Sequence, residues 1–253
     1  VTFAIITVLS VWYIYSSVRL DVGFVPEGAM RRFAGLRARM RRTIREERRE
    51  IHSTHSLQGR LAVFLVLAFG MGWSVLAWDL SMSLDLHFQS TLYSWWLFMG
   101  GWVAALASFT ILVMWWRRHL DAYDLITENH FHDLGKLCFA FTAFWGYLTF
   151  GQYLVIWYGN MAEKTQWMHH RLTSPWLPLT LAVTFLMFVL PFFGLLTRAA
   201  KVYLPTMFLF AGCTVVGLWL HRYLEVSPSL HPEASGAPLG IWELGVTAGY
   251  LGI

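Results

Sequence analysis

The stretch WDLSMSLDLHFQST, residues 78–91, places proton-handling side chains between two long apolar runs. A carboxylate such as Asp79 and an imidazole such as His87 can both exchange protons, the imidazole near neutral pH. Ionisable groups at membrane depth are costly unless they pair or face water, so Asp79 and His87 are candidate site residues. Asp85 and Ser90 have a simpler alternative, which is to cap the next helix by accepting backbone N–H bonds.

A second polar group lies on the apolar run 134–158. At 100° per residue, one side of this predicted helix carries four side chains and should face protein: Thr142, Trp145, Thr149 and Gln152. An amide without a partner costs several kcal/mol in an apolar medium, roughly 2–7. Gln152 therefore needs a neighbouring helix or a bound polar ligand. At the end of this run and just beyond it come three more candidates, Trp157, Asn160 and Glu163, of which the first belongs to an interfacial aromatic belt.

The other end of the same run carries a third polar group. Glu128, His132, Asp133 and Lys136 stand where the helix begins, and His with carboxylates can pass protons near neutral pH. We expect them to be candidates for proton uptake at the inner face. Alternatively, Asp133 is the N-cap of the helix, where the macrodipole favours a negative charge.

The composition identifies the solvent around these groups as lipid. Hydrophobic residues make up 57% of the chain and charged residues 13%, with a mean hydropathy of +0.49, far from a soluble domain. A bilayer core of roughly 30 Å needs about 20 apolar residues per helix. The predicted fold is an all-α polytopic transmembrane bundle, and we expect the sequence to be a fragment of a longer chain. Full spans are predicted at residues 61–78, 91–116, 134–158, 176–197 and 203–222.

Positive charge orients the spans. Arginine is concentrated in residues 19–60, and such segments stay cytoplasmic, which places 79–90 and 159–175 outside. The predicted regions are a partial transmembrane helix over 1–18, a basic cytoplasmic loop over 19–60, a five-helix region over 61–224, and a periplasmic loop with the start of a final helix over 225–253. The basic segment explains the net charge of +4 without nucleic acid, and it can also contact anionic membrane lipids.

Several kinds of site are not expected on this chain. Cys138 and Cys213 each lie inside an apolar run, so a disulfide framework, a zinc site or a cysteine-ligated cluster is disfavoured. Axial haem ligands need buried histidines. None of the ten histidines lies in the middle of a predicted span, and His221 lies near the end of one. We therefore expect neither metal nor haem on this chain.

Three stretches carry a resemblance to the NrfD-like, or polysulfide-reductase-like, family of membrane subunits. The first stretch resembles the family's D-W-x-M-S-L-x-P-x-W-x-S-T segment and reads WDLSMSLDLHFQSTLYSWWLFMGG. The second resembles the corresponding segment in bacterial alternative complex III and reads HDLGKLCFAFTAFWGYLTFGQYLVIWYGNMAEKTQWMHHR. HRYLEVSPSLHP and WELGVTAGYLG are similar to the last loop and helix. The DLGKL form is closest to the second of that complex's two large membrane subunits, and the resemblance covers about residues 60–253.

The resemblance implies a subunit of a respiratory quinol:cytochrome c oxidoreductase in the bacterial inner membrane. It implies menaquinone or ubiquinone as ligand, with haem and iron–sulfur clusters on partner subunits. The implied partners are a sister NrfD-like subunit, periplasmic iron–sulfur and multihaem cytochrome c subunits, and possible contact with a terminal oxidase. Matching positions are Asp79, Met82, Ser83, Ser90, Thr91, Asp133, Lys136, Gln152, Trp157, Asn160, Glu163 and Arg171.

Departures from the family pattern fall on the outer face. Leu80, Leu86 and Phe88 stand where the pattern has Trp, Pro and Trp, and Ala162 and Lys164 replace Pro and Glu. The chain is therefore expected either to bind quinol itself or to be a proton-conducting companion of a catalytic sister. A purely structural anchor or a secondary transporter would also be consistent with a polytopic chain of this composition. A transporter should have broken helices and charges near the midplane.

The first prediction separates a working site from a structural role. If the polar stretches handle protons or quinol, Asp79→Asn and Gln152→Leu should each cause a large loss of quinol-dependent acceptor reduction by the intact, fully assembled complex. Unchanged turnover would instead mean that these groups cap and join helices.

Overall fold

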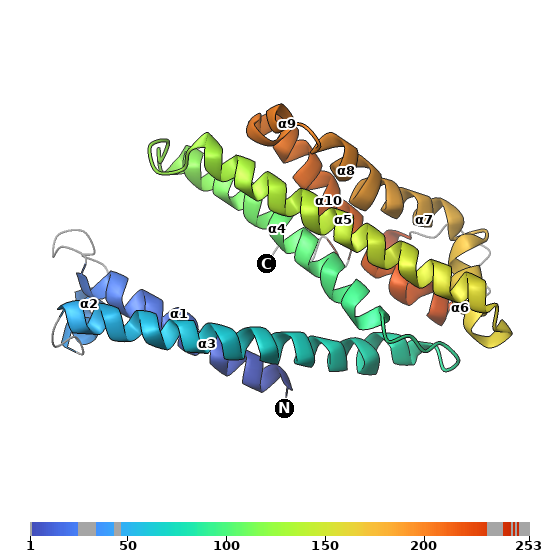
Figure 1. The fold of residues 1–253 in the computed structure, drawn as a ribbon, viewed down its shortest axis with the longest axis horizontal. Coiled ribbons are helices and arrows are strands. Elements are labelled where there is room, and N and C mark those ends of the chain that lie inside the picture. The colour runs from blue at the N-terminus through green and yellow to red at the C-terminus, as the bar shows by residue number, and fades with distance from the viewer. Residues whose placement is uncertain are drawn as a thin grey trace. The chain divides into compact units, whose positions relative to one another are not determined.

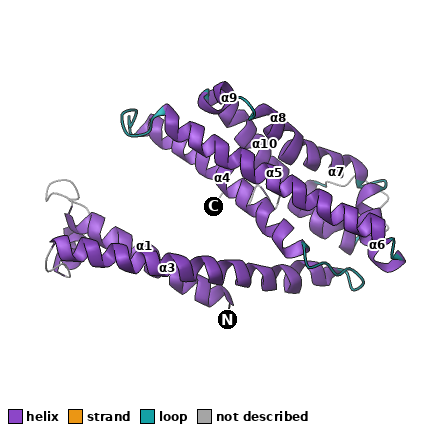
Figure 2. Cartoon of the chain, in the orientation of Figure 1, coloured by secondary structure: helices purple, strands orange, loops and turns teal. Residues whose placement is uncertain are grey.

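The computed structural model describes residues 2–24, 34–42, 47–231 and 240–243, together with Gly245 and Thr247. All regular structure in these parts of the chain is helical (Figure 2). Six of the described helical segments are long and apolar enough to cross a membrane. The chain is therefore an all-α, multi-pass membrane protein, as its composition predicted. It forms two compact units, residues 1–75 and 76–253.

The first unit consists of α1 (Thr2–Phe24), α2 (Ala34–Arg42) and most of α3 (Glu47–Leu76). Within it, Arg19 of α1 forms a 2.6 Å ion pair with Glu50 of α3. Gly72 of α3 lets α1 approach, because a Cβ there would overlap the side chain of Thr2. The segment predicted as a basic loop is thus largely helical where it is described, since Arg and Glu are good helix formers.

The second unit holds the other polar stretches. After α3 the chain makes a π-helical turn and a 3₁₀ turn, and four further spans follow, the third of them broken by a second π-helical turn (Figure 1). Its elements are η2 (Ala77–Ser81), η3 (Met82–Leu84), α4 (Tyr93–His119), α5 (Glu128–Gly159), α6 (Ala162–Leu172), α7 (Leu177–Thr184), η4 (Phe185–Val189), α8 (Leu190–Gly194), α9 (Arg198–Val202) and α10 (Leu204–Leu230).

Helix α10 extends beyond the end of its predicted span. It continues past residue 222 to Leu230 and includes Arg222 and Glu225. These two charges lower the local hydropathy, but they form a 2.6 Å ion pair with each other inside the bundle. A charge that is paired can be kept within a span, so the helix continues where the hydropathy pattern indicates an end.

Close packing in this unit depends on small residues at the helix contacts. Helix α4 packs against both α5 and α10. At Gly100 of α4, an added Cβ would lie 3.1 Å from the indole nitrogen of Trp145 on α5. At Gly217 of α10, it would lie 2.7 Å from Cγ of Met187 and 3.3 Å from the Met187 backbone nitrogen. Small residues let helices approach in lipid, where dispersion and hydrogen bonding drive association.

The contact at Gly217 gives a stability prediction. Gly217→Ala should destabilise the protein by about 1–3 kcal/mol, the usual cost of overpacking, because the Met187 backbone cannot easily move away. Gly212→Ala is the matched control on the same helix, since nothing lies within 4 Å of an added Cβ there. The control should be neutral or stabilising, because Ala is a better helix former by about 0.8–1 kcal/mol. Thermal unfolding in detergent measures both, and equal midpoints would contradict the packing.

Candidate functional site

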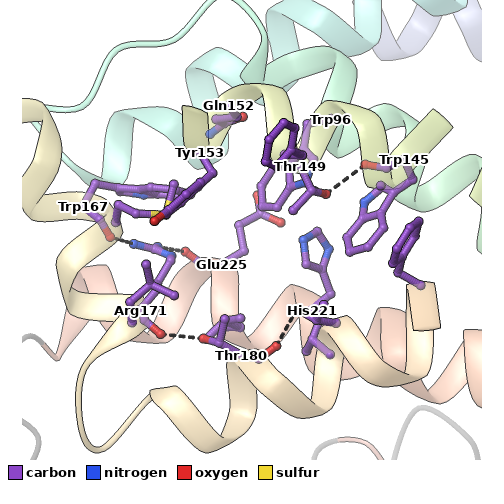
Figure 3. A pocket seen from close by; sticks show the side chains of 18 residues that line it. Trp96, Trp145, Thr149, Gln152, Tyr153, Trp167, Arg171, Thr180, His221 and Glu225 are labelled. Carbon is purple, nitrogen blue, oxygen red and sulfur yellow. Dashed lines mark hydrogen bonds between the residues drawn. The ribbon is translucent and has the colours of Figure 1, made fainter. Parts of the chain in front are cut away.

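A cavity of about 330 Å³ lies among α4, α5, α6, α7 and α10 (Figure 3). Its walls are mainly apolar, and three indole rings line it: Trp96, Trp145 and Trp167. Besides three threonines, the cavity is lined by the amide of Gln152 and by three ionisable side chains: Arg171, His221 and Glu225. An apolar pocket with a few convergent polar groups is the usual form of a small-molecule site.

His221 is the most distinctive of these groups. It is 2% exposed and lies well inside α10, nine residues before its end at Leu230, so its predicted place near a helix end is wrong. Its ring meets the Trp96 ring edge-on at 4.5 Å and the Trp145 ring at 5.6 Å. Neither imidazole nitrogen has a hydrogen-bond partner among the described residues. A buried group left unpaired costs free energy unless a ligand or water completes it.

Glu225 lies one turn further along α10 and is fully paired. Ser81 of η2 donates a hydrogen bond to Oε1, and the hydroxyl of Tyr93 on α4 donates to the same oxygen at 2.8 Å. Arg222 donates to Oε2 at 2.6 Å and also binds the carbonyl oxygen of Leu97 at 2.9 Å. The carboxylate is therefore held at a fixed position on the wall of the cavity.

Arg171 fixes the short helix α6 to α10. Its guanidinium donates to the carbonyl oxygens of Trp167 at 2.8 Å and Glu225 at 2.7 Å, and to the hydroxyl of Ser229 at 3.1 Å. It also lies 3.8 Å from the centre of the Trp167 ring, in cation–π contact. Burial lowers the pKa of Arg171 to about 10, so the group stays charged at neutral pH.

Gln152 connects the cavity with a second one. It is 4% exposed, and neither its amide nitrogen nor its oxygen has a partner in the described residues. The second cavity, of about 810 Å³, is lined by Gln152 together with Met82, Ser90 and Lys164. The two polar stretches of the sequence therefore meet in space, with Gln152 between them. On the predicted helix side, Thr142, Trp145 and Gln152 are buried and Thr149 is half-buried.

The other outer candidates lie on the surface of the unit. Asp79, His87, Trp157, Asn160 and Glu163 are all exposed. Asn160 is the C-cap of α5 with a positive φ of 41°, a conformation that Asn tolerates. Glu163 lies in the first turn of α6, where a negative charge favours the helix dipole. Local helix geometry accounts for these two residues.

The capping alternatives for the first stretch are wrong. Helix α4 begins at Tyr93 with Leu92 at its N-cap, and no side chain accepts a hydrogen bond there. Asp85 instead accepts a hydrogen bond from the backbone N–H of His87 at 3.2 Å. This is a local turn in which a short carboxylate binds the backbone two residues on.

The inner candidates lie together at the start of α5. This helix begins at Glu128 with Thr127 as N-cap, in a capping box with His130. The alternative that made Asp133 the cap is therefore wrong, because the helix starts five residues earlier. Asp133 instead pairs with Lys136 at 3.0 Å and lies 4.0 Å from His132. These four candidates form an exposed or half-exposed polar surface.

Sequence reasoning did not find His221 and Glu225 as site residues. Their signal was the spacing of His221, Glu225 and Ser229 at every fourth position, which puts all three on one side of a helix. That spacing is informative only if the helix continues through the charged residues. Arg171 is one of the positions that match the family pattern.

Comparisons with known proteins add no assignment: no protein-family model and no curated protein matches the sequence. The described residues contain no group of three or more His, Cys, Asp or Glu side chains that could hold a metal ion. The chemistry of the site must therefore be argued from its own residues.

The position of Arg171 gives a second stability prediction. Arg171→Met should destabilise the purified protein by about 1.5–3 kcal/mol, the range for hydrogen bonds to a charged group, because three acceptors lose their donor and α6 loses its tie to α10. Arg198→Met, at an exposed position of α9, is the control and should leave stability unchanged. Thermal unfolding and limited proteolysis within α6 measure the effect. Equal protease resistance of the two variants would contradict this role.

Proposed function

We propose that this chain is a membrane subunit of a respiratory quinol:cytochrome c oxidoreductase of the alternative complex III type, and that its cavity binds the quinol ring. The observation that carries the proposal is the unpaired His221 ring, buried between two indoles in a membrane-embedded cavity. A quinol is flat, apolar on its faces and polar at two opposite oxygens. The cavity is mainly apolar and contains several aromatic rings, with polar groups at separate points of its wall.

The residues present fit such a ring. Aromatic pairs favour edge-on and offset contacts, so the rings of Trp96 and Trp145 can flank a planar ligand. A neutral His221 nitrogen can accept a hydroxyl proton from a quinol, and the unpaired amide of Gln152 can donate to or accept from an oxygen. Both groups would then gain the hydrogen bonds that they lack in the described structure.

Proton transfer assigns a role to the paired carboxylate. Oxidation of a quinol releases two protons and two electrons. Glu225 lies one turn from His221 on the same side of α10, and Ser81 and Tyr93 bind its Oε1. These two hydroxyls can pass protons from the carboxylate toward η2. A positioned acid or base of this kind contributes about 10²–10⁴-fold to a rate.

Electrons would leave through other subunits of the assembly. The proposal assigns haem and iron–sulfur clusters to periplasmic partners and pairs the chain with a sister NrfD-like subunit, in a bacterial inner membrane. Menaquinone and ubiquinone both present the ring chemistry that the cavity suits. The six membrane-crossing helices support the membrane setting, and the family resemblance supports the assembly.

A purely structural anchor is the second candidate. The bonds of Arg171, Tyr93 and Arg222 join α4, α6 and α10, and such bonds would also serve an anchor. The anchor hypothesis does not account for His221, because a structural histidine in a membrane core should have a partner.

The proposal predicts that the cavity variants lose activity in an assembled complex. His221→Asn and Glu225→Gln should each lower quinol-dependent acceptor reduction about 100-fold or more, because each removes a proton acceptor. His119→Asn, at an exposed histidine of α4, is the control and should keep full activity. If both cavity variants assemble and turn over within twofold of the wild type, quinol is oxidised elsewhere and the anchor hypothesis holds.

A further inference from the structure

The cavity opens toward the side of the bundle, between α5 and α7. Three of its lining residues are also substantially exposed: Phe150 at 61%, Tyr153 at 37% and Leu172 at 38%. The first two belong to the membrane span α5, and Leu172 ends α6 beside it. Because these apolar side chains lie on or beside a span, the opening faces the bilayer.

The helix packing explains why this side is open. Helix α7 packs against α10, α6 and η4, whereas the main partners of α5 are α4 and α9, with smaller contacts to α6, η4 and α8. The two spans come together at the π-helical turn and at α8, and Gly146 of α5 has no room for a Cβ because it lies against the ring of Phe188. Phe188 therefore closes one border of the opening, and Leu172 lies at the opposite border.

The polar groups lie away from the opening. His221 and Glu225 are both on α10, and both are buried, while the exposed lining residues are hydrophobic apart from the hydroxyl of Tyr153. A molecule that crosses the opening would thus meet apolar side chains first and hydrogen-bonding groups last. This order matches an amphiphile that enters with its polar ring first and keeps an apolar tail in lipid.

The size of the cavity agrees with that order. Its volume of about 330 Å³ is at the lower end of the roughly 300–1,000 Å³ typical of small-molecule pockets. It has room for a single substituted ring but not for a long isoprenoid or acyl chain as well. Any tail must therefore remain in the opening and the surrounding bilayer.

We propose that the cavity takes its ligand laterally from the membrane through an opening bordered by Phe150, Tyr153, Leu172 and Phe188, and that the ligand's apolar tail rests in this opening. The inference rests on the proposed function, because it takes the headgroup to be a quinol ring. It adds the route of access and makes the tail part of what the site recognises.

The direct test uses the wild-type protein in native membranes. A quinone that carries a photoreactive diazirine on its tail is irradiated, and the labelled peptides are mapped by mass spectrometry. Displaceable labelling at Phe150, Tyr153 or Leu172 is expected. Displaceable labelling at other positions of this chain would overturn the lateral opening while leaving a quinol site in place. The absence of any labelling that excess unlabelled quinone displaces would overturn the proposed function itself.

A pair of variants on α7 tests the same route by kinetics. Thr184 lines the cavity, whereas Leu181 is 60% exposed and does not. Thr184→Trp should narrow the opening and raise KM about tenfold for a long-tailed quinol, with a smaller effect on a tail-less quinol with the same ring. Leu181→Trp is the matched control and should leave both KM values unchanged.

The comparison of the two substrates decides the interpretation. If Thr184→Trp raises KM equally for the tailed and the tail-less quinol, the tail-binding role is overturned. If the Leu181→Trp control also raises KM, a partner subunit rather than lipid covers this side of the bundle. That result would equally overturn lateral access.

Discussion

The rest of the second unit depends on one constraint, which is that the Glu225 carboxylate is buried within a membrane span. An ionised group in that position must be paired and hydrogen-bonded. Its partners come from three parts of the chain: Ser81 from η2, Tyr93 from α4 and Arg222 from α10 itself. The charge can be buried only when all three parts are in place, so it fixes the turn after α3 and the start of α4 against α10.

The π-helical turn η2 follows from the same constraint. A π-helical turn adds a residue to a helix and often occurs at functional sites. Here it places Ser81 against Glu225, while the neighbouring Asp79 is exposed. The second π-helical turn, η4, carries Met187 against Gly217 and Phe188 against Gly146. Both irregular turns therefore border the region of the cavity.

The contrast between paired and unpaired groups separates support from function. The carboxylate of Glu225 and the two terminal nitrogens of the Arg171 guanidinium have hydrogen-bond partners within the protein, and they hold the helices in position. His221 and Gln152 are equally buried, yet their ring and amide atoms lack partners among the described residues. Groups without a partner gain the most from a hydrogen bond to a ligand, because their burial is not yet compensated. The assignment of the site rests on this difference.

The sequence by itself determined the membrane class, the approximate spans and the polar side of the helix with Gln152, because hydropathy and helical period are local properties. It also placed polar stretches at both ends of that helix. Tertiary structure alone decided which polar residues matter. Asp79 and His87 are exposed, whereas His221 and Glu225, near and beyond the predicted end of their span, are buried. The physical reason is that charged residues lower the hydropathy, so the predicted span ends at them. In the folded bundle the helix continues, because an ion pair and two hydroxyls from distant parts of the chain stabilise the charge.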